Sequence, residues 1–432
     1  MKKVDSLVKG ELLELKINKS RIQNNIQELG EIGLSEEGGV NRSLASQADA
    51  ESRNWLKAYW KKYCEIGTFT DAAANLWGDY PYVDEKNLKP IIIGSHNDSV
   101  PEGGKYDGAL GVLLATEIFQ TLVENHVYLK HPLKLISLTG EEPNPYQIST
   151  LGSKVISGVV SKQYLAQFKH IETGESLGEA INRLGGNFEK LEEAQWPKDS
   201  FSAFIECHIE QGRRLFDSGD PVAVVKKITG IYRELVIIHG QANHAGTTDV
   251  FHRKDALLAL SWLNIKLREY LKKINVSEPV VGTIGFAEVI PNAANIIPGS
   301  VRFNIDLRSG DWNLVEKVVE YLDSLFSELK NKGIAATRKI ILNQKPVDLN
   351  SRIINALSTT IEQDSKLNLK VFTSMAGHDA ANMAKIGQSG MLFVKSIDGK
   401  SHCKEEYSKI EDIEVAGNVL LKTLLNLDRE LE

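Results

Sequence analysis

The chain has 432 residues, of which 42% are hydrophobic and 25% are charged. This composition is typical of a soluble globular enzyme of roughly two or three domains, and it excludes collagen, a coiled coil or disorder for the whole chain. The 51 basic and 57 acidic side chains give a net charge of −6 without a basic block, which argues against a nucleic-acid partner.

The cysteines and the first residues indicate a compartment. The chain has three cysteines at wide spacing, Cys64, Cys207 and Cys403. Such a pattern is not a disulfide framework, so we expect free thiols and a cytoplasmic location. Residues 1–23 mix charged residues with leucines, which is unlike a secretory signal, and no apolar run approaches the ~18 residues of a membrane span.

The first half of the chain alternates helical and strand patterns. Apolar residues at helical spacing and short apolar or alternating runs predict helices at 12–30, 48–64 and 111–123, and strands at 90–93, 133–138 and 201–210. In the last of these strands, Cys207 falls on the apolar face and His208 on the polar face. Alternating elements of this kind favour an α/β layer architecture.

The middle of the chain has a different order of elements. We expect strands at 232–240, 280–289, 301–307 and 335–342, and helices at 253–273 and 311–332. This β-α-β-β-α-β order is typical of a ferredoxin-like unit. A helix at 351–363 and a strand at 391–394 then resume the first pattern. We therefore predict an α/β fold in which a mixed-sheet domain, 1–224 and 341–432, is interrupted by a ferredoxin-like domain, 225–340.

Polar clusters follow the first two predicted strands of this layer. His96 and Asp98 come directly after strand 90–93, Asp107 lies in the same loop, and Glu141 and Glu142 follow strand 133–138. Ligand sites in α/β sheets lie beyond the carboxyl ends of the strands. Imidazole and carboxylate groups are suitable ligands for divalent metals, although each cluster alone also fits an ordinary polar turn.

Three more histidines lie near the other strands. His208 stands at the end of strand 201–210, His402 follows strand 391–394, and His378 lies in the segment Ala376–Ala380. Because the strand ends of an α/β sheet meet at one edge, these clusters together predict a site for one or two metal ions there.

The interrupting domain carries polar clusters of its own. His244 follows its first strand, Asn295 lies in the segment 291–299, and Arg308 ends a strand. Arginine is a natural bidentate partner of a substrate carboxylate. A turn at 291–299 and a surface salt bridge for Arg308 are the structural alternatives.

These motifs occur in a specific order. Read along the chain, they are GSHNDSV, YDG, TGEE, HIEQG, NHAGTT, NAANIIPG, DLR, AGHDA and GKSH. In this order the sequence resembles the M20-type metal-dependent amidohydrolases of the hydantoinase/carbamoylase group. That group includes N-carbamoyl-L-amino-acid hydrolases, β-ureidopropionases and allantoate amidohydrolases, so the resemblance implies hydrolysis of a small ureido acid.

The resemblance implies a binuclear centre. Asp107 would bridge two divalent ions, with Glu142 and His402 on one and His96 and His208 on the other. Mixed imidazole and carboxylate ligands suit Zn, Mn, Co or Ni.

The resemblance also implies the roles of the catalytic residues. Glu141 would be the general base toward the attacking water, Asp98 would orient His96, and Gln211 would contact the ureido group. His244 would reach in from the partner subunit to stabilise the oxyanion.

The remaining implied residues bind substrate. Asn295 and Arg308 would hold the substrate carboxylate, and His378 would line the pocket. The interrupting domain would be a lid and a dimerisation surface, which implies a homodimer.

Three segments depart from the family pattern. Pro143-Asn144-Pro145-Tyr146 replaces Gly-Ser-Arg-Phe, Asp249-Val250 replaces Pro-Met, and Ser374-Met375 replaces a Ser-Gly pair. The missing arginine leaves the substrate open among carbamoyl amino acids, ureidopropionate and allantoate. An aminoacylase or dipeptidase of M20 type, and a catalytically silent binding protein, are the alternatives.

Overall fold

The computed structural model describes residues 15–274 and 279–431, which form two compact units. The first unit contains the described residues up to 226 together with 348–372 and 377–431. The second contains the described residues of 227–347 together with 373–376. Part of the predicted helix 12–30, and most of the segment judged unlike a secretory signal, lie outside the described residues.

The first unit is built on a nine-stranded mixed sheet. Its strands are β1 (Gly67–Thr70), β2 (Leu76–Asp79), β3 (Ile91–His96), β4 (Leu133–Leu138), β5 (Ala203–Ile209), β6 (Val222–Ile228), β12 (Val347–Asp348), β13 (Val371–Ser374) and β14 (Ser389–Val394). They run in the order β1-β2-β4-β3-β5-β14-β6-β12, with β13 paired to β6. The four central strands β4, β3, β5 and β14 are parallel to one another, whereas β1, β2 and β6 pair antiparallel. The carboxyl ends of four adjacent strands therefore meet at one edge.

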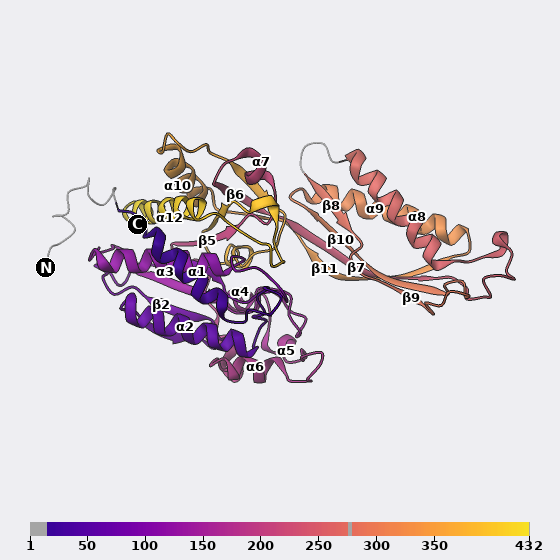
Figure 1. Cartoon of the computed structure of the whole chain (residues 1–432), viewed down its shortest axis with the longest axis horizontal. Coiled ribbons are helices and arrows are strands. Elements are labelled where there is room, and N and C mark those ends of the chain that lie inside the picture. The colour runs from indigo at the N-terminus through magenta and orange to yellow at the C-terminus, as the bar shows by residue number, and fades with distance from the viewer. Residues whose placement is uncertain (1–14, 275–278, 432) are drawn as a thin grey trace. The chain divides into compact units, whose positions relative to one another are not determined.

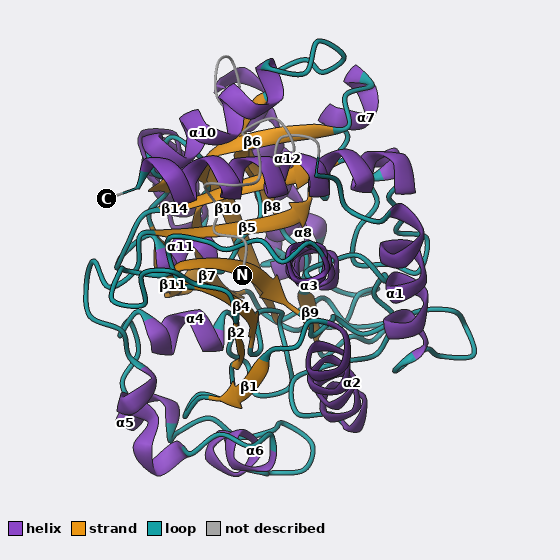
Figure 2. Ribbon diagram, turned by 90° about the vertical axis from the view of Figure 1, so that its left-hand side faces the viewer, coloured by secondary structure: helices purple, strands orange, loops and turns teal. Residues whose placement is uncertain are grey.

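Helices cover both faces of this sheet (Figure 2). They are α1 (Lys19–Glu31), α2 (Gln47–Tyr63), α3 (Ala109–Glu124), α4 (Leu151–Ile156), α5 (Lys162–Leu165), α6 (Leu177–Arg183), α7 (Arg214–Ser218), α10 (Ser351–Glu362), α11 (Ala380–Met383) and α12 (Ile410–Glu430), with short 3₁₀ turns at Phe188–Ala194 and Ile397–Gly399. The apolar helix α3 packs with α10 and α12 in the main core, while α4 and α11 pack against the sheet and each other.

The central strand β5 is buried on both faces, as its place between β3 and β14 requires. Cys207 lies in the core with α3, as its alternation predicts. On the other face the carboxylate of Glu206 accepts hydrogen bonds from Ser95 Oγ and from the amide of Ala380, each at 2.8 Å. The polar face of this strand is therefore an interior surface under α11.

The second unit is a five-stranded antiparallel sheet with two helices. Its elements are β7 (Gly230–His239), α8 (Ala256–Ile274), β8 (Val280–Thr283), β9 (Ala287–Ile290), β10 (Ser300–Ser309), α9 (Trp312–Asn331) and β11 (Ala335–Gln344), with a short 3₁₀ turn at Val250–His252. The strand order is β11-β7-β10-β8, with β9 also paired to β10. Figure 1 shows α8 and α9 on one face of this sheet, and their apolar sides form its core with β7 and β10.

Three predicted elements differ from the structure. The single strand expected at 280–289 is two strands, because β8 and β9 pair with β10 in registers that differ by one residue. The first helix begins at Lys19, where Asn18 accepts a hydrogen bond from the amide of Arg21. Helix α8 begins at Ala256, because the side chain of Asp255 accepts hydrogen bonds from the backbone amides of Leu257 and Leu258. These side chains satisfy amides that the first helical turn leaves without a partner.

The three cysteines are free in the structure, as expected. None of the described helices combines the length and the apolar character needed to cross a membrane.

Candidate metal centre

Histidines and carboxylates meet at the carboxyl ends of the four parallel strands. His96 is the last residue of β3, and His208 is the last but one of β5. Glu141 and Glu142 lie in the turn that follows β4, and His402 lies in the loop after β14. The structure thus brings together side chains that lie more than three hundred residues apart in the sequence.

Asp107 faces histidines on both of its oxygens. Its Oδ1 lies 3.1 Å from His208 Nε2 and 3.7 Å from His96 Nε2. Its Oδ2 lies 3.4 Å from His402 Nε2, which is itself 3.3 Å from Glu142 Oε1. Three groups in this cluster have ligand atoms within 4.8 Å of one another: His96 with Asp107 and His208, Asp107 with Glu142 and His402, and His96 with Glu141 and Glu142. A carboxylate shared between two groups is the geometry of a bridging ligand.

The orientation of the imidazole rings fits metal binding. His96 Nδ1 lies 3.1 Å from the carbonyl oxygen of Asp98, and His208 Nδ1 lies 2.9 Å from that of Ile209. Because a carbonyl oxygen only accepts, each Nδ1 carries a proton, so each ring in its neutral form presents a lone pair on Nε2. The two Nε2 atoms are 3.5 Å apart, and the buried Asp107 Oδ1 has no hydrogen-bond partner among the described residues. A divalent cation would satisfy all three atoms.

The electrostatics of the cluster also favour a cation. Burial raises the pKa of Glu141 well above its usual value. The hydrogen bonds that the His402 ring donates to the carboxylates of Asp107 and Glu142 raise its pKa to about 11. Burial opposes ionisation of Asp107, but the charge of His208 outweighs it and holds the pKa of Asp107 well below its usual value. The same concentration of buried carboxylates, which raises the pKa of His402, also favours binding of divalent ions.

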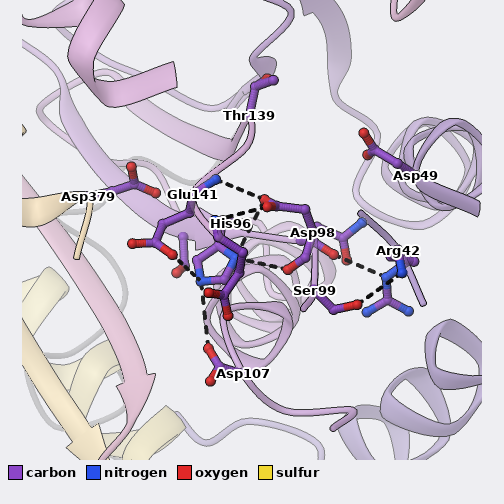
Figure 3. Close-up of polar contacts among 12 residues, drawn as sticks. Arg42, Asp49, His96, Asp98, Ser99, Asp107, Thr139, Glu141 and Asp379 are labelled. Carbon is purple, nitrogen blue, oxygen red and sulfur yellow. Dashed lines mark hydrogen bonds and ion pairs between the residues drawn. The ribbon is translucent and has the colours of Figure 1, made fainter. Parts of the chain in front are cut away.

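Asp98 contacts both His96 and the turn that carries Glu141 and Glu142 (Figure 3). Its carboxylate accepts hydrogen bonds from the amides of Glu141 at 3.1 Å and Glu142 at 3.0 Å, and one oxygen lies 3.6 Å from His96 Nδ1. The shorter contact to His96 comes from the carbonyl of Asp98. Asp98 therefore fixes the turn that carries the two glutamates as well as the ring of His96.

The start of α4 holds the same turn from the other side. The amides of Thr150, Leu151 and Gly152 donate to three consecutive carbonyls of the turn at 139–141, at 2.8 to 2.9 Å. The intervening segment that departs from the family pattern is well packed. Tyr146 is buried, and its hydroxyl donates to Glu175 at 2.6 Å. The two prolines of this segment thus leave the turn with Glu141 firmly anchored.

Gln211 and His378 lie beside the cluster. Gln211 Nε2 donates to Asp107 Oδ2 at 2.7 Å and lies 3.4 Å from His402 Nε2. Gln211 and His402 both adopt left-handed backbone conformations, with φ of 58°, a feature that concentrates at functional sites. The ring of His378 is buried 4.6 Å from that of His208, and burial together with that neighbour lowers its pKa well below the usual value.

Two supporting residues were not predicted from the sequence. Glu406 is buried and its Oε1 accepts from the amides of Tyr106 at 3.0 Å and Asp107 at 2.9 Å, so it fixes the backbone of Asp107. Burial raises the pKa of Glu406 to about 7. Gly108 has φ of 64°, and a Cβ there would lie 2.1 Å from Cε1 of His96. The ring of His96 therefore needs the space that only glycine leaves.

The other predicted residues belong to the second unit. His244 and Asn295 are neighbours there, because a β-bridge joins His244 to Ile296 and the amide of Ala245 donates to the carbonyl of Asn295. Arg308 donates to Asp306 Oδ1 at 2.8 Å and to the carbonyl of Met375 at 3.3 Å.

An α/β sheet with histidines and carboxylates at the ends of its central parallel strands is typical of metal-dependent hydrolases. The family model of the peptidase family M20/M25/M40 matches residues 92–426. The chain belongs to this family and is an amidohydrolase of it.

Named relatives cover almost the whole chain. The N-carbamoyl-L-amino acid amidohydrolase of Geobacillus stearothermophilus is 32% identical over 95% of this chain and 99% of its own length. The allantoate amidohydrolase of Bacillus subtilis is 32% identical over 95% of this chain and 98% of its own. The solved structure of a hydantoinase/carbamoylase-family amidase from Burkholderia multivorans is 28% identical, covers 95% of this chain and 98% of its own, and superposes with a TM-score of 0.85. The resemblance to the hydantoinase/carbamoylase group is thus confirmed.

Proposed function

We propose that this chain hydrolyses the ureido C–N bond of N-carbamoyl-L-amino acids or related ureido acids, using two divalent ions. The observation that carries the proposal is Asp107, whose two oxygens face separate groups of ligand atoms. His96 and His208 would hold one ion, Glu142 and His402 the other, and Asp107 both. Zn, Mn, Co and Ni all suit this donor set.

The residues of the cluster divide the chemistry among them. Bound divalent ions would polarise the ureido carbonyl and acidify the attacking water. Glu141 would take a proton from that water and return it to the leaving nitrogen of the amino acid. The C–N bond to that nitrogen breaks, and the released carbamate decomposes to ammonia and carbon dioxide. Gln211, already donating to Asp107, would turn its amide to the ureido group.

The second unit would supply the remaining contacts. His244 Nδ1 accepts from the amides of Gly246 at 3.1 Å and Thr247 at 3.2 Å, so the neutral ring carries its proton on Nε2. Such a donor suits an oxyanion. Asn295 and Arg308 would hold the substrate carboxylate, and this ferredoxin-like unit, 225–340, would act as a lid on a catalytic domain formed by 1–224 and 341–432.

A homodimer is part of the proposal. Apolar side chains lie exposed on α8 and in the 3₁₀ turn before it: Phe251 is 94% exposed, Val250 72%, Leu258 68% and Ile265 59%. Exposed apolar side chains of this kind support an interface. A second copy of the chain is the occupant that would also bring His244 to a partner's site.

Complementation between two inactive variants tests the trans role of His244. We expect Glu141→Gln and His244→Ala each to abolish most activity alone. Co-expressed dimers should regain about a quarter of the wild-type sites, because random pairing makes half the dimers mixed and each has one intact site. Ammonia release by the co-purified mixture measures this. No regain, with mixed dimers demonstrated by two affinity tags, contradicts a site shared between subunits.

A substrate panel tests the reaction itself. The metal-reconstituted protein is assayed with N-carbamoyl-L-amino acids, ureidopropionate and allantoate for ammonia release, and with dipeptides and N-acyl amino acids for free amino acid. We expect turnover of at least one ureido acid, its loss with a chelator, and its return with added metal. Turnover confined to dipeptides or acyl amino acids, or absent throughout, would exclude the proposed activity.

A further inference from the structure

Arg42 is a buried cation that lies beside Ser99, next to the candidate metal centre (Figure 3). Only 1% of the residue is exposed. Its guanidinium donates to three main-chain carbonyls: Nε to Asn97 at 3.0 Å, and Nη1 to Leu29 at 2.7 Å and Ile32 at 3.1 Å. Burying a charge is costly unless hydrogen bonds compensate it, so a side chain retained in this place calls for an explanation.

The backbone of Arg42 is tied to the same segment. Its amide donates to Ser99 Oγ at 2.9 Å, and the amide of Ser99 donates to the carbonyl of Arg42 at 3.1 Å. Arg42 is thus hydrogen-bonded to residues 97 and 99, which flank Asp98. Asn97 is anchored a second time, because its Nδ2 donates to Ser52 Oγ in α2 at 2.7 Å.

Asp98 connects residues 97–99 to the cluster of proposed ligands. Its carbonyl lies 3.1 Å from His96 Nδ1, and its carboxylate accepts from the amides of Glu141 and Glu142. A shift of residues 97–99 would therefore move a proposed ligand, the proposed base and a second ligand together. Groups of this kind, which orient the ligands, control metal affinity.

The positive charge of Arg42 also stabilises the negative charge of Asp98. Asp98 is itself buried, and in the neutral, metal-binding form His96 provides no positive charge for it. Burial lowers the pKa of Arg42 to about 10, while the charges of Asp98 and Asp49 stabilise the guanidinium cation. Arg42 therefore remains charged near neutral pH and stabilises the negative charge of the Asp98 carboxylate. It precedes the part of the chain that the family model matches, 92–426.

We propose that Arg42 is a positioning residue of the metal centre: by fixing residues 97–99, it holds His96 and the Glu141–Glu142 turn in the geometry that binds metal. This inference rests on the proposed function, because it takes these side chains as the metal site. It extends that site to the segment before α2, which carries none of the proposed ligands.

The test compares Arg42→Met and Arg42→Lys with the control Arg21→Met. Arg21 joins α1 to α3 through Glu117 at 2.6 Å and Glu124 at 2.7 Å, so its loss also removes a partly buried arginine. Metal affinity is measured by chelator competition, the ligand geometry by the visible absorption of the Co²⁺-substituted protein, and folding by the melting temperature.

We expect Arg42→Met to weaken metal binding by about 10–100-fold and to change the Co²⁺ spectrum. Arg42→Lys keeps the charge but loses the planar fork, so it should recover part of the affinity. If Arg42→Met does not fold, Arg42→Lys decides, with several-fold weaker binding expected. Arg21→Met should melt earlier than the wild type yet bind metal as the wild type does.

Two outcomes would overturn this inference but leave the proposed function standing. One is wild-type affinity and spectrum in the folded Arg42 variants. The other is an equal loss of metal in Arg21→Met at a matched melting temperature, which would assign the effect to general destabilisation. A wild-type protein that binds no metal would overturn the proposed function and the inference with it.

Discussion

Replacement of Glu141 by glutamine is expected to lower kcat by ~10²–10⁴-fold while the metal content stays at the wild-type level. Glutamine keeps the shape of the side chain and the hydrogen bond that the backbone amide of residue 141 makes to Asp98. It cannot take a proton from water, so the chemical step loses its base. Ammonia release from the best ureido substrate, together with metal analysis of the same sample, measures both quantities.

The metal content decides between two roles for Glu141. Its carboxylate also lies in a group with His96 and Glu142, where it would be a ligand rather than a base. A variant that loses metal together with activity would favour the ligand role. Full turnover with metal bound would exclude both roles. Glu117→Gln is a suitable control, because Glu117 is also a buried glutamate but pairs with Arg21 away from the site.

The convergence of polar clusters could be predicted from local sequence. His96 and Glu141 each follow a short apolar run, and runs of that kind form parallel strands whose carboxyl ends share an edge. The order β4-β3-β5-β14 could not be derived in this way, because strand pairing depends on contacts between distant segments. The roles of the clustered residues in metal binding and catalysis stay predictions.

The supporting residues of the site could not be predicted from the sequence for a related reason. Arg42 acts on a segment 55 residues away, and Glu406 on amides 299 and 300 residues away. Periodicity and motif spacing report on neighbours along the chain, not on hydrogen bonds of this range. By contrast, α12 at Ile410–Glu430 has apolar residues at helical spacing. This pattern predicts a helix from the local sequence, although α12 is not among the predicted elements.

The structure also shows why so many buried carboxylates are compatible at one place. Glu406 accepts two backbone amides, and Asp98 accepts two more, so neither charge depends on a metal ion alone. Asp107 differs from both. Its Oδ2 accepts from Gln211 and Ser401, each at 2.7 Å, but its Oδ1 faces only imidazole nitrogens. Asp107 is therefore the carboxylate whose replacement discriminates best between a metal site and a polar core.

Asp107→Asn is expected to lower kcat/KM by at least ~10³-fold, because a metal ion contributes several kcal/mol to stabilising the transition state. The amide has one oxygen, so it can serve one group of ligand atoms but not both. We therefore expect the bound metal to fall to half of the wild-type amount or less. In a polar core without metal, the same change would remove a buried charge and leave metal content unaffected.

The control for Asp107→Asn is Asp412→Asn in α12. This change removes a largely buried carboxylate that pairs with Lys395 at 3.1 Å. Its metal content and turnover should remain those of the wild type. Metal content by atomic emission and the affinity of each site by chelator titration provide the comparison. Two ions retained by Asp107→Asn would contradict a bridging role and leave the two groups of ligand atoms as independent sites.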